Sequence, residues 1–117
     1  MIRRGDVCWV DLEPAEGSEA NGWRPAVVVS SDQANRGATK AGRGVITVVP
    51  LTTNVTVLRP YQVGVEPGVS GLRHTSKAQV EQIRALALHR ISTPPIGTLP
   101  PEVMAQIDRA LRIHLAL

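Results

Sequence analysis

The sequence predicts a mainly β protein with a C-terminal helix, built as a small antiparallel barrel or as a sheet packed by one helix. The β prediction rests on two uninterrupted apolar runs at residues 26–31 and 45–52, because such runs are typical of strands buried on both faces. The helix prediction rests on Pro100-Pro101-Glu102, since proline in the first helical turn costs no hydrogen bond. Apolar residues then recur at three-to-four spacing, so we expect one side of this helix to face the core.

The elements around the first apolar run follow from composition. Residues 6–12 contain a strand-like core rich in β-branched and aromatic side chains. Residues 13–23 hold two glycines, a proline and three acids, which predicts a loop longer than a hairpin needs. Pro25 cannot donate to a ladder, so it belongs at the start of the strand that follows. Residues 32–44 are polar and glycine-rich, and we expect a loop with at most a short turn of helix. Pro50 predicts a bulge or kink in the second buried strand.

The middle of the chain predicts shorter elements. Residues 53–58 favour a turn or a weak strand, and residues 60–66 alternate as a strand does. Residues 67–71 predict a turn. We expect a last strand over residues 76–84, followed by a short helix or loop, although residues 78–88 also suit a helix.

Length and composition exclude several classes of protein. The 117 residues fit a single domain over residues 1–117. The single cysteine, Cys8, excludes an internal disulfide framework and predicts a buried core thiol. No apolar run reaches the ~20 residues of a membrane helix, and no secretory signal is present, so we expect a soluble cytoplasmic protein. The net charge of +3 permits a nucleic-acid partner without demanding one.

The motifs of common cofactor and metal sites are absent. The sequence contains no phosphate-binding glycine loop, no His-Glu-x-x-His and no Cys-x-x-Cys. The three histidines are isolated from one another, so no metal site and no cofactor are predicted.

The polar residues that border the buried strands are the candidates for chemistry. Arg24 ends the long loop and opens a buried strand, so it is rigidly placed and can face a cleft. Thr52 ends the other buried strand. Composition alone favours a solvated arginine and a turn-forming threonine at these positions. For Glu81, Gln82 and Arg84, the solvent face of a strand is likewise the default interpretation.

Several short motifs occur in a fixed order along the chain. They are Arg4-Gly5-Asp6-Val7, Asp11-Leu12-Glu13-Pro14, Gly17-Ser18-Glu19, Arg24-Pro25-Ala26-Val27-Val28-Val29-Ser30, Val48-Val49-Pro50-Leu51-Thr52-Thr53-Asn54 and Glu81-Gln82-Ile83-Arg84. This ordered set, together with the terminal helix, resembles the MazF/PemK family of toxins. The similarity covers essentially the whole chain.

The resemblance implies the toxin of a type II toxin–antitoxin system. It implies an SH3-like antiparallel barrel with a C-terminal helix, assembled as a homodimer. It also implies a sequence-specific, metal-independent endoribonuclease that cleaves single-stranded RNA by attack of the 2′-OH, with a MazE-like antitoxin that covers the RNA site. The family's catalytic pair falls on Arg24 and Thr52. The apolar segment 111–117 independently suits a partner surface.

RNA recognition should use the edges of splayed, single-stranded bases. The candidate contacts are Ser18, Glu19 and Asn21 in the long loop, with Gln82 near the site. Trp23 suits either stacking on a base or packing under the loop.

Two further roles are left open at this point. Glu81 matches a position that carries an acid in some family members, so it is the candidate general base; an ion pair with Arg84 is the alternative. Six cations could follow the RNA backbone, with a solvated surface as the alternative for each: Arg36, Lys40, Arg43, Arg59, Arg73 and Lys77.

Two rival functions are weighed against RNA cleavage. Gyrase-poisoning toxins of the CcdB type share the barrel but depend on a tryptophan at the extreme C-terminus, whereas this chain ends in Leu117 and its tryptophans are Trp9 and Trp23. A family member that only binds RNA or antitoxin is the second rival, and the presence of Arg24 and Thr52 gives it no support.

Overall fold

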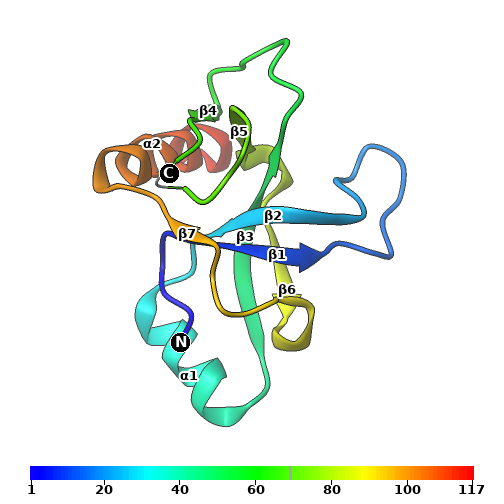
Figure 1. The fold of residues 1–117 in the computed structure, drawn as a ribbon, viewed down its shortest axis with the longest axis vertical. Helices are drawn as coiled ribbons and strands as arrows, with labels where there is room; N and C mark the ends of the chain where they lie inside the picture. Colours follow the sequence, from blue (N-terminus) through cyan, green and yellow to red (C-terminus); the bar gives the residue numbers. More distant parts are fainter. Residues whose placement is uncertain (69) are drawn as a thin grey trace.

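Seven antiparallel strands share one sheet with a helix at each of two sides (Figure 1). The computed structural model describes residues 1–68 and 70–117. Its elements are β1 (Asp6–Asp11), β2 (Trp23–Val28), α1 (Asp32–Ala41), β3 (Val45–Thr52), β4 (Gln62–Val65), β5 (Ser76–Gln79), the 3₁₀ turn η1 (Val80–Gln82), β6 (Arg84–Ala87), the 3₁₀ turn η2 (Leu88–Arg90), β7 (Gly97–Thr98) and α2 (Pro101–Leu115). The prediction of a mainly β fold with a C-terminal helix is confirmed.

Strand β3 lies in the middle of the sheet and pairs along both of its edges. One edge pairs with β2, and the strand order continues through β1 to β7. The other edge pairs first with β6, as far as Val48 opposite Arg84, and then with β5, from Leu51 opposite Ala78. Pro50 lies where this edge changes partner, and η1 fills the interval between the two partner strands. The expected irregularity at Pro50 is therefore a change of neighbour within one continuous strand.

The central strands bury both of their faces. Val7, Val27 and Val49 lie in one apolar cluster, which contains Ile107 of α2. Their neighbours in the same strands, such as Cys8, Val28 and Val48, lie in a second cluster, which contains Ala38 of α1. Because side chains alternate along a strand, the two helices cover opposite faces. The apolar runs were predicted to be buried on both faces, and this prediction is confirmed.

The loop predicted over residues 32–44 is wrong, because most of it forms α1. Ser31 caps the helix by accepting a hydrogen bond from the N–H of Ala34 at 3.2 Å, and Gly42 ends it in the left-handed conformation with φ 68°. The helix buries only Asn35 and Ala38. A polar segment that buries a single apolar side chain, Ala38, has few apolar residues to mark it as a helix in the sequence.

The strand predicted over residues 76–84 is also wrong in extent. The chain leaves β5 at Gln79, turns through η1 and resumes as β6, which runs to Ala87. The strand predicted at residues 60–66 is confirmed as β4, whereas residues 53–58 form no strand. The turn predicted at residues 67–71 includes Val69, which lies outside the described residues.

Helix α2 begins at the predicted prolines and buries Ile107 and Ala110 against the sheet. Arg4, near the N-terminus, forms an ion pair with Asp108 of this helix at 2.5 Å. Ile113 and Leu115 remain about half exposed at its end. Within residues 1–68 and 70–117, no helix has the length and apolar content needed to cross a membrane.

Candidate active site

The register of the central strands brings Arg24 and Thr52 to the same end of the sheet. The β2–β3 ladder pairs Ala26 with Pro50, and its continuation by two residues sets Arg24 opposite Thr52. The pleat repeats every two residues, so both side chains share the face of Ala26. The loop between β1 and β2 projects from this end of the sheet, away from both helices (Figure 1).

The Arg24 guanidinium is held by the last turn of that loop. Its Nε donates to the backbone oxygen of Asn21 at 2.6 Å, and its Nη2 donates to the Asn21 side-chain oxygen at 3.2 Å. A guanidinium has five N–H donors in a planar fork, so Nη1 and part of Nη2 remain for a ligand. Arg24 is half-buried, and its direction is set before any ligand arrives.

Thr52 offers a hydroxyl donor next to this cation. Its Oγ1 accepts a hydrogen bond from the N–H of Asn54 at 3.2 Å, which leaves the hydroxyl proton to donate elsewhere. The cross-strand neighbour of Thr52 is Lys77. Lys77 is only 8% exposed, and its Nζ donates to the backbone oxygen of Val57. The suggestion that Lys77 follows an RNA backbone is therefore wrong.

Hydrogen bonds close the base of the long loop. The N–H of Leu12 donates to the backbone oxygen of Gly22 at 2.9 Å, and the N–H of Gly22 donates to the Glu13 carboxylate at 2.6 Å. Arg84 donates to the backbone oxygen of Leu12 at 2.9 Å, and Arg90 donates to that of Glu13. Two arginines in and after β6 thus hold the base of the β1–β2 loop, although β6 and the β1–β2 hairpin lie on opposite edges of β3.

Gln82 reaches the same loop nearer to its tip. Its Oε1 accepts from the N–H of Ala20 at 2.8 Å, and its Nε2 donates to the backbone oxygen of Ser18 at 2.9 Å. The predicted contact residues therefore do meet: Gln82 touches the loop that presents the exposed Ser18, Glu19 and Asn21. Both ends of the Gln82 amide are occupied by the loop backbone.

A polar pocket of about 340 Å³ lies between this loop and η1. Glu19 and Ala20 line it on the loop side, and residues 81–84 line it on the other. Glu81 accepts from Nε2 of Gln62 at 2.6 Å through its Oε2. Its Oε1 is shielded from solvent and has no hydrogen-bond partner among the described residues. The alternative of a Glu81–Arg84 ion pair is wrong, since Arg84 bonds to Leu12 instead.

The tryptophans form a feature that sequence reasoning missed. Trp9 and Trp23 stack with ring centroids 6.4 Å apart and planes at 13°. Trp23 is 55% exposed, so it does not pack under the loop. The sequence does place Trp9 and Trp23 in two strands joined by a single loop. Adjacent antiparallel strands bring side chains on the same face into contact.

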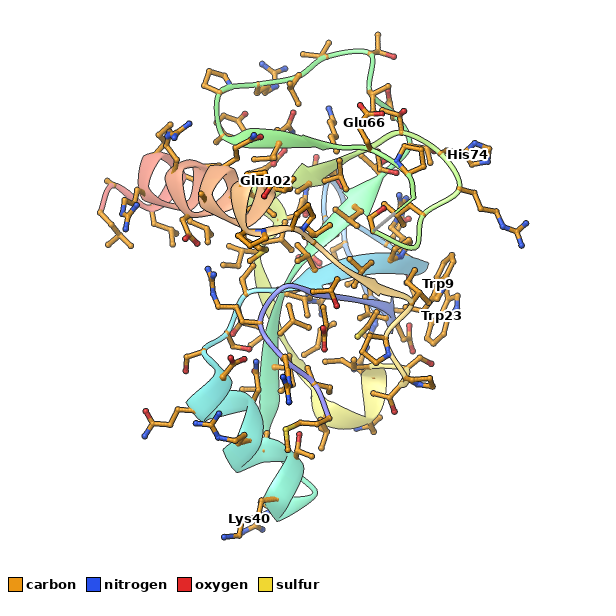
Figure 2. The ribbon with its side chains drawn as sticks, turned by 60° about the vertical axis from the view of Figure 1, so that its left-hand side comes forward. Trp9, Trp23, Lys40, Glu66, His74 and Glu102 are labelled. Carbon is orange, nitrogen blue, oxygen red and sulfur yellow. The ribbon has the colours of Figure 1, made fainter. Side chains whose placement is uncertain are left out.

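Cys8 and two cations at the end of α1, Lys40 and Arg43, lie outside this site. Cys8 is fully buried in the core, as predicted, and burial, with a smaller contribution from Asp6, raises the pKa of its thiol to about 11. Lys40, on α1, lies at the lower end of the molecule in Figure 2, away from Trp9 and Trp23 at mid-height. In the described parts of the chain, no three His, Cys, Asp or Glu side chains form a group that could hold a metal ion.

Comparisons with known proteins identify the family of this chain. Residues 3–115 match the family described as "PemK-like, MazF-like toxin of type II toxin-antitoxin system". The chain is 53% identical over 117 residues to Endoribonuclease MazF9 of Mycobacterium tuberculosis, covering 100% of this chain and 98% of that protein.

Solved structures give the same result for the fold. An endoribonuclease in complex with its cognate antitoxin, from a mycobacterial species, superimposes with a TM-score of 0.79 at 26% identity and covers 100% of this chain and 97% of its own. MazF from Deinococcus radiodurans gives a TM-score of 0.81 at 22% identity, covering 99% of this chain and 97% of its own. The chain therefore belongs to the PemK-like, MazF-like family of toxins of type II toxin–antitoxin systems.

Proposed function

We propose that this protein is a toxin that cleaves single-stranded RNA at a specific sequence, without a metal ion, and so inhibits translation and growth. The observation that carries the proposal is the cross-strand placement of Arg24 and Thr52, derived from the β2–β3 register. The full-length similarity to a mycobacterial endoribonuclease supports it.

The substrate brings its own nucleophile. The RNA 2′-OH attacks the neighbouring phosphorus in line, the 5′-oxygen leaves with a proton, and the products carry 2′,3′-cyclic phosphate and 5′-OH ends. The protein therefore contributes mainly by positioning the reacting groups and stabilising the developing charge. A guanidinium presents a positive charge and a planar fork of donors, so the role of Arg24 is to hold two phosphoryl oxygens as negative charge builds. Thr52 donates its hydroxyl to a third oxygen or to the 2′-OH.

Glu81 is the candidate general base. Its Oε2 is committed to Gln62, whereas Oε1 lacks a partner in the described part of the chain. A carboxylate oxygen without a donor is available to accept a proton. Glu81 also borders the pocket that the long loop encloses, on the side of the sheet end where we expect the RNA.

Base recognition is assigned to the exposed side of the long loop. Ser18, Glu19 and Asn21 present hydroxyl, carboxylate and amide groups there, and such groups suit the edges of unstacked bases. We assign Gln82 to the same recognition surface. Its amide contributes by setting the shape of the loop through Ala20 and Ser18.

We further propose a homodimer, a MazE-like antitoxin partner and a cytoplasmic location, with residues 1–117 acting as a single domain. The half-exposed Ile113 and Leu115 at the end of α2 provide apolar surface for a second copy. The antitoxin follows from the similarity to a mycobacterial endoribonuclease solved with its own antitoxin.

The test is incubation of the protein with a long mixed-sequence RNA in EDTA, followed by mapping of the cut ends. We expect discrete cuts with the ends given above, and their loss in Arg24→Ala. Arg43→Ala is the matched control, because Arg43 is an exposed arginine that follows α1. Absence of cuts from the folded wild-type protein would contradict the proposal and make gyrase inhibition the next assay.

A further inference from the structure

We propose that the stacked indoles of Trp9 and Trp23, with the apolar pocket beside them, bind one unpaired base of the RNA substrate. Arg73 and His74, on the rim of this pocket, bind the adjoining phosphate. This inference rests on the proposed ribonuclease function. It adds a subsite on the face of the sheet opposite to Arg24.

The pocket is open, largely apolar and about 540 Å³ in volume. Trp9 and Pro25 contribute one wall from β1 and β2, and Leu72 and Ile96 contribute another. Volumes of this order are typical of sites for small organic groups. A nucleobase has two flat apolar faces, so it fits an apolar lining better than a charged ligand would.

The indoles form a flat platform rather than a packed core. The β1–β2 register pairs Trp9 with Pro25 and Asp11 with Trp23, so the two rings are diagonal neighbours on one face. Their near-parallel stacking leaves Trp9 37% and Trp23 55% exposed. Indoles are usually buried, and exposed pairs mark binding surfaces. Flat aromatic side chains bind bases of any identity by stacking.

The charges on the rim favour a nucleotide over an apolar protein segment. Arg73 and His74 are both exposed, and neither side chain has a hydrogen bond or an ion pair with any of the described residues. Figure 2 shows His74 on the same side of the molecule as the two indoles. The nearby Glu66 carboxylate accepts a hydrogen bond from the Thr75 hydroxyl at 3.1 Å. The rim thus offers a cation next to a stacking surface, which is the pairing that single-stranded nucleic acid needs.

The pocket and the proposed catalytic pair are formed by neighbouring residues on opposite faces of the same strand ends. Thr53, which lines the pocket, directly follows Thr52, and Trp23 directly precedes Arg24. Successive side chains point to opposite faces of a strand. An RNA strand that crosses the end of β2 and β3 can therefore place its reacting phosphate at Arg24 and a neighbouring base on the indoles.

The experiment uses tryptophan fluorescence and cleavage kinetics together. The probe is a 2′-O-methyl RNA that carries the mapped cut sequence. This RNA cannot be cleaved, because its methyl groups replace the 2′-OH protons of the nucleophile. We expect it to quench the indole emission of the wild-type protein. For Trp23→Ala we expect KM for cleavable RNA to rise about 10-fold, the range that loss of one stacking contact predicts, with kcat changed less than twofold.

Two further variants separate stacking from structure and charge from shape. Trp23→Phe should restore most of the affinity, because a phenyl ring still stacks. Arg73→Ala should reduce the slope of log affinity against log salt by about one, whereas Arg43→Ala should not.

Three results would overturn the inference. The first is an unchanged KM in Trp23→Ala while the wild-type protein still cuts RNA, which leaves the ribonuclease proposal intact. The second is the absence of quenching by a bound probe. The third is indole emission already shielded from acrylamide in the free protein, since a second copy would then cover the platform. Failure of the wild-type protein to cut any RNA would instead contradict the proposed function.

Discussion

The side-chain oxygen of Gln82 accepts a hydrogen bond from the N–H of Ala20 at 2.8 Å, across 62 positions of the chain. The amide nitrogen of the same side chain donates to Ser18. The residue after Ala20 is Asn21, which holds the Arg24 guanidinium through two hydrogen bonds. A continuous set of contacts therefore connects the η1 turn to the proposed catalytic arginine.

We expect Gln82→Ala to slow RNA cleavage about 10-fold. The substitution removes two hydrogen bonds, each with a net contribution of about 1 kcal/mol, and frees the loop segment that orients Arg24. Gln82→Glu keeps the acceptor for Ala20 but sets a carboxylate oxygen against the Ser18 carbonyl, so its rate should also fall. Single-turnover cleavage measures the effect, with Gln33→Ala on the exposed side of α1 as the control. Equal rates for the two alanine variants would contradict this connection.

We expect Arg24→Lys to lose about 10²-fold or more in the cleavage rate. The ammonium keeps the charge but lacks the planar fork. It cannot bond to Asn21 and at the same time offer two parallel donors to a phosphate, as the guanidinium can. Loss of one directed donor of this kind typically costs about 10²–10³ in rate. A rate within threefold of the wild type would show that charge alone is sufficient at this position.

The parts of this molecule that the sequence predicts are those in which local chemistry and tertiary environment agree. The runs 26–31 and 45–52 are apolar because both faces of β2 and β3 are covered, and α2 begins at the predicted prolines. α1 was missed because its ten residues bury only Asn35 and Ala38. Ser31 and Gly42 cap its two ends, and its composition is polar and glycine-rich, which favoured a loop there.

The candidate site likewise contains residues that the sequence places and contacts that only the fold determines. Local composition places Arg24 and Thr52 beside the apolar runs but favours a solvated arginine and a turn-forming threonine there. The catalytic role of the two residues comes from the resemblance to MazF/PemK toxins and stays a prediction. The partner of Gln82 depends on how η1 inserts between β5 and β6, which is set by the change of neighbour along β3. Sequence reasoning expected one strand there and therefore could not see that the amide faces the loop.

Glu81→Gln should lower the cleavage rate with little change in RNA affinity. Glutamine has the same shape, and its oxygen can still accept from Gln62, so the fold around η1 should persist. What it loses is the ability to take up a proton, and general-base catalysis typically contributes about 10²–10⁴ in rate. Single-turnover rates and binding to the uncleavable 2′-O-methyl RNA separate the two effects. An unchanged single-turnover rate would remove Glu81 from the mechanism.

The buried thiol of Cys8 makes stability depend on pH at the alkaline end. Its pKa rises from 9.0 to about 11, chiefly through burial, so the unfolded state loses this proton first as pH increases. The contribution to stability is complete below pH 9 and is lost between about pH 9 and pH 11, at up to roughly 1.4 kcal/mol per pH unit. Urea unfolding across that range should show a steeper fall for the wild type than for Cys8→Ala. Parallel curves would show that the thiol titrates normally.

Gly97 and Gly71 mark a close crossing of two backbone segments beside the indole pocket. A Cβ built on Gly97 would lie 2.4 Å from the carbonyl carbon and oxygen of Ser70, and one on Gly71 would lie 2.0 Å from the oxygen of Ile96. These neighbours are backbone atoms, which cannot rotate aside as a side-chain terminus can. The segment after Gly71 also carries Leu72 and Arg73, which line the pocket.

We therefore expect Gly97→Ala to lower the free energy of unfolding by about 1–3 kcal/mol, the range of overpacking substitutions, and the melting temperature by roughly 5–15 °C. Gly64→Ala is the matched control. Gly64 lies in β4 with no atom within 4 Å of its built Cβ and no positive φ, so alanine there should be neutral or slightly stabilising. Thermal unfolding of both variants decides the matter, because the two substitutions add the same methyl group to strand positions. Equal melting temperatures would contradict the close approach of Ser70 and Gly97 that supports the wall of the pocket.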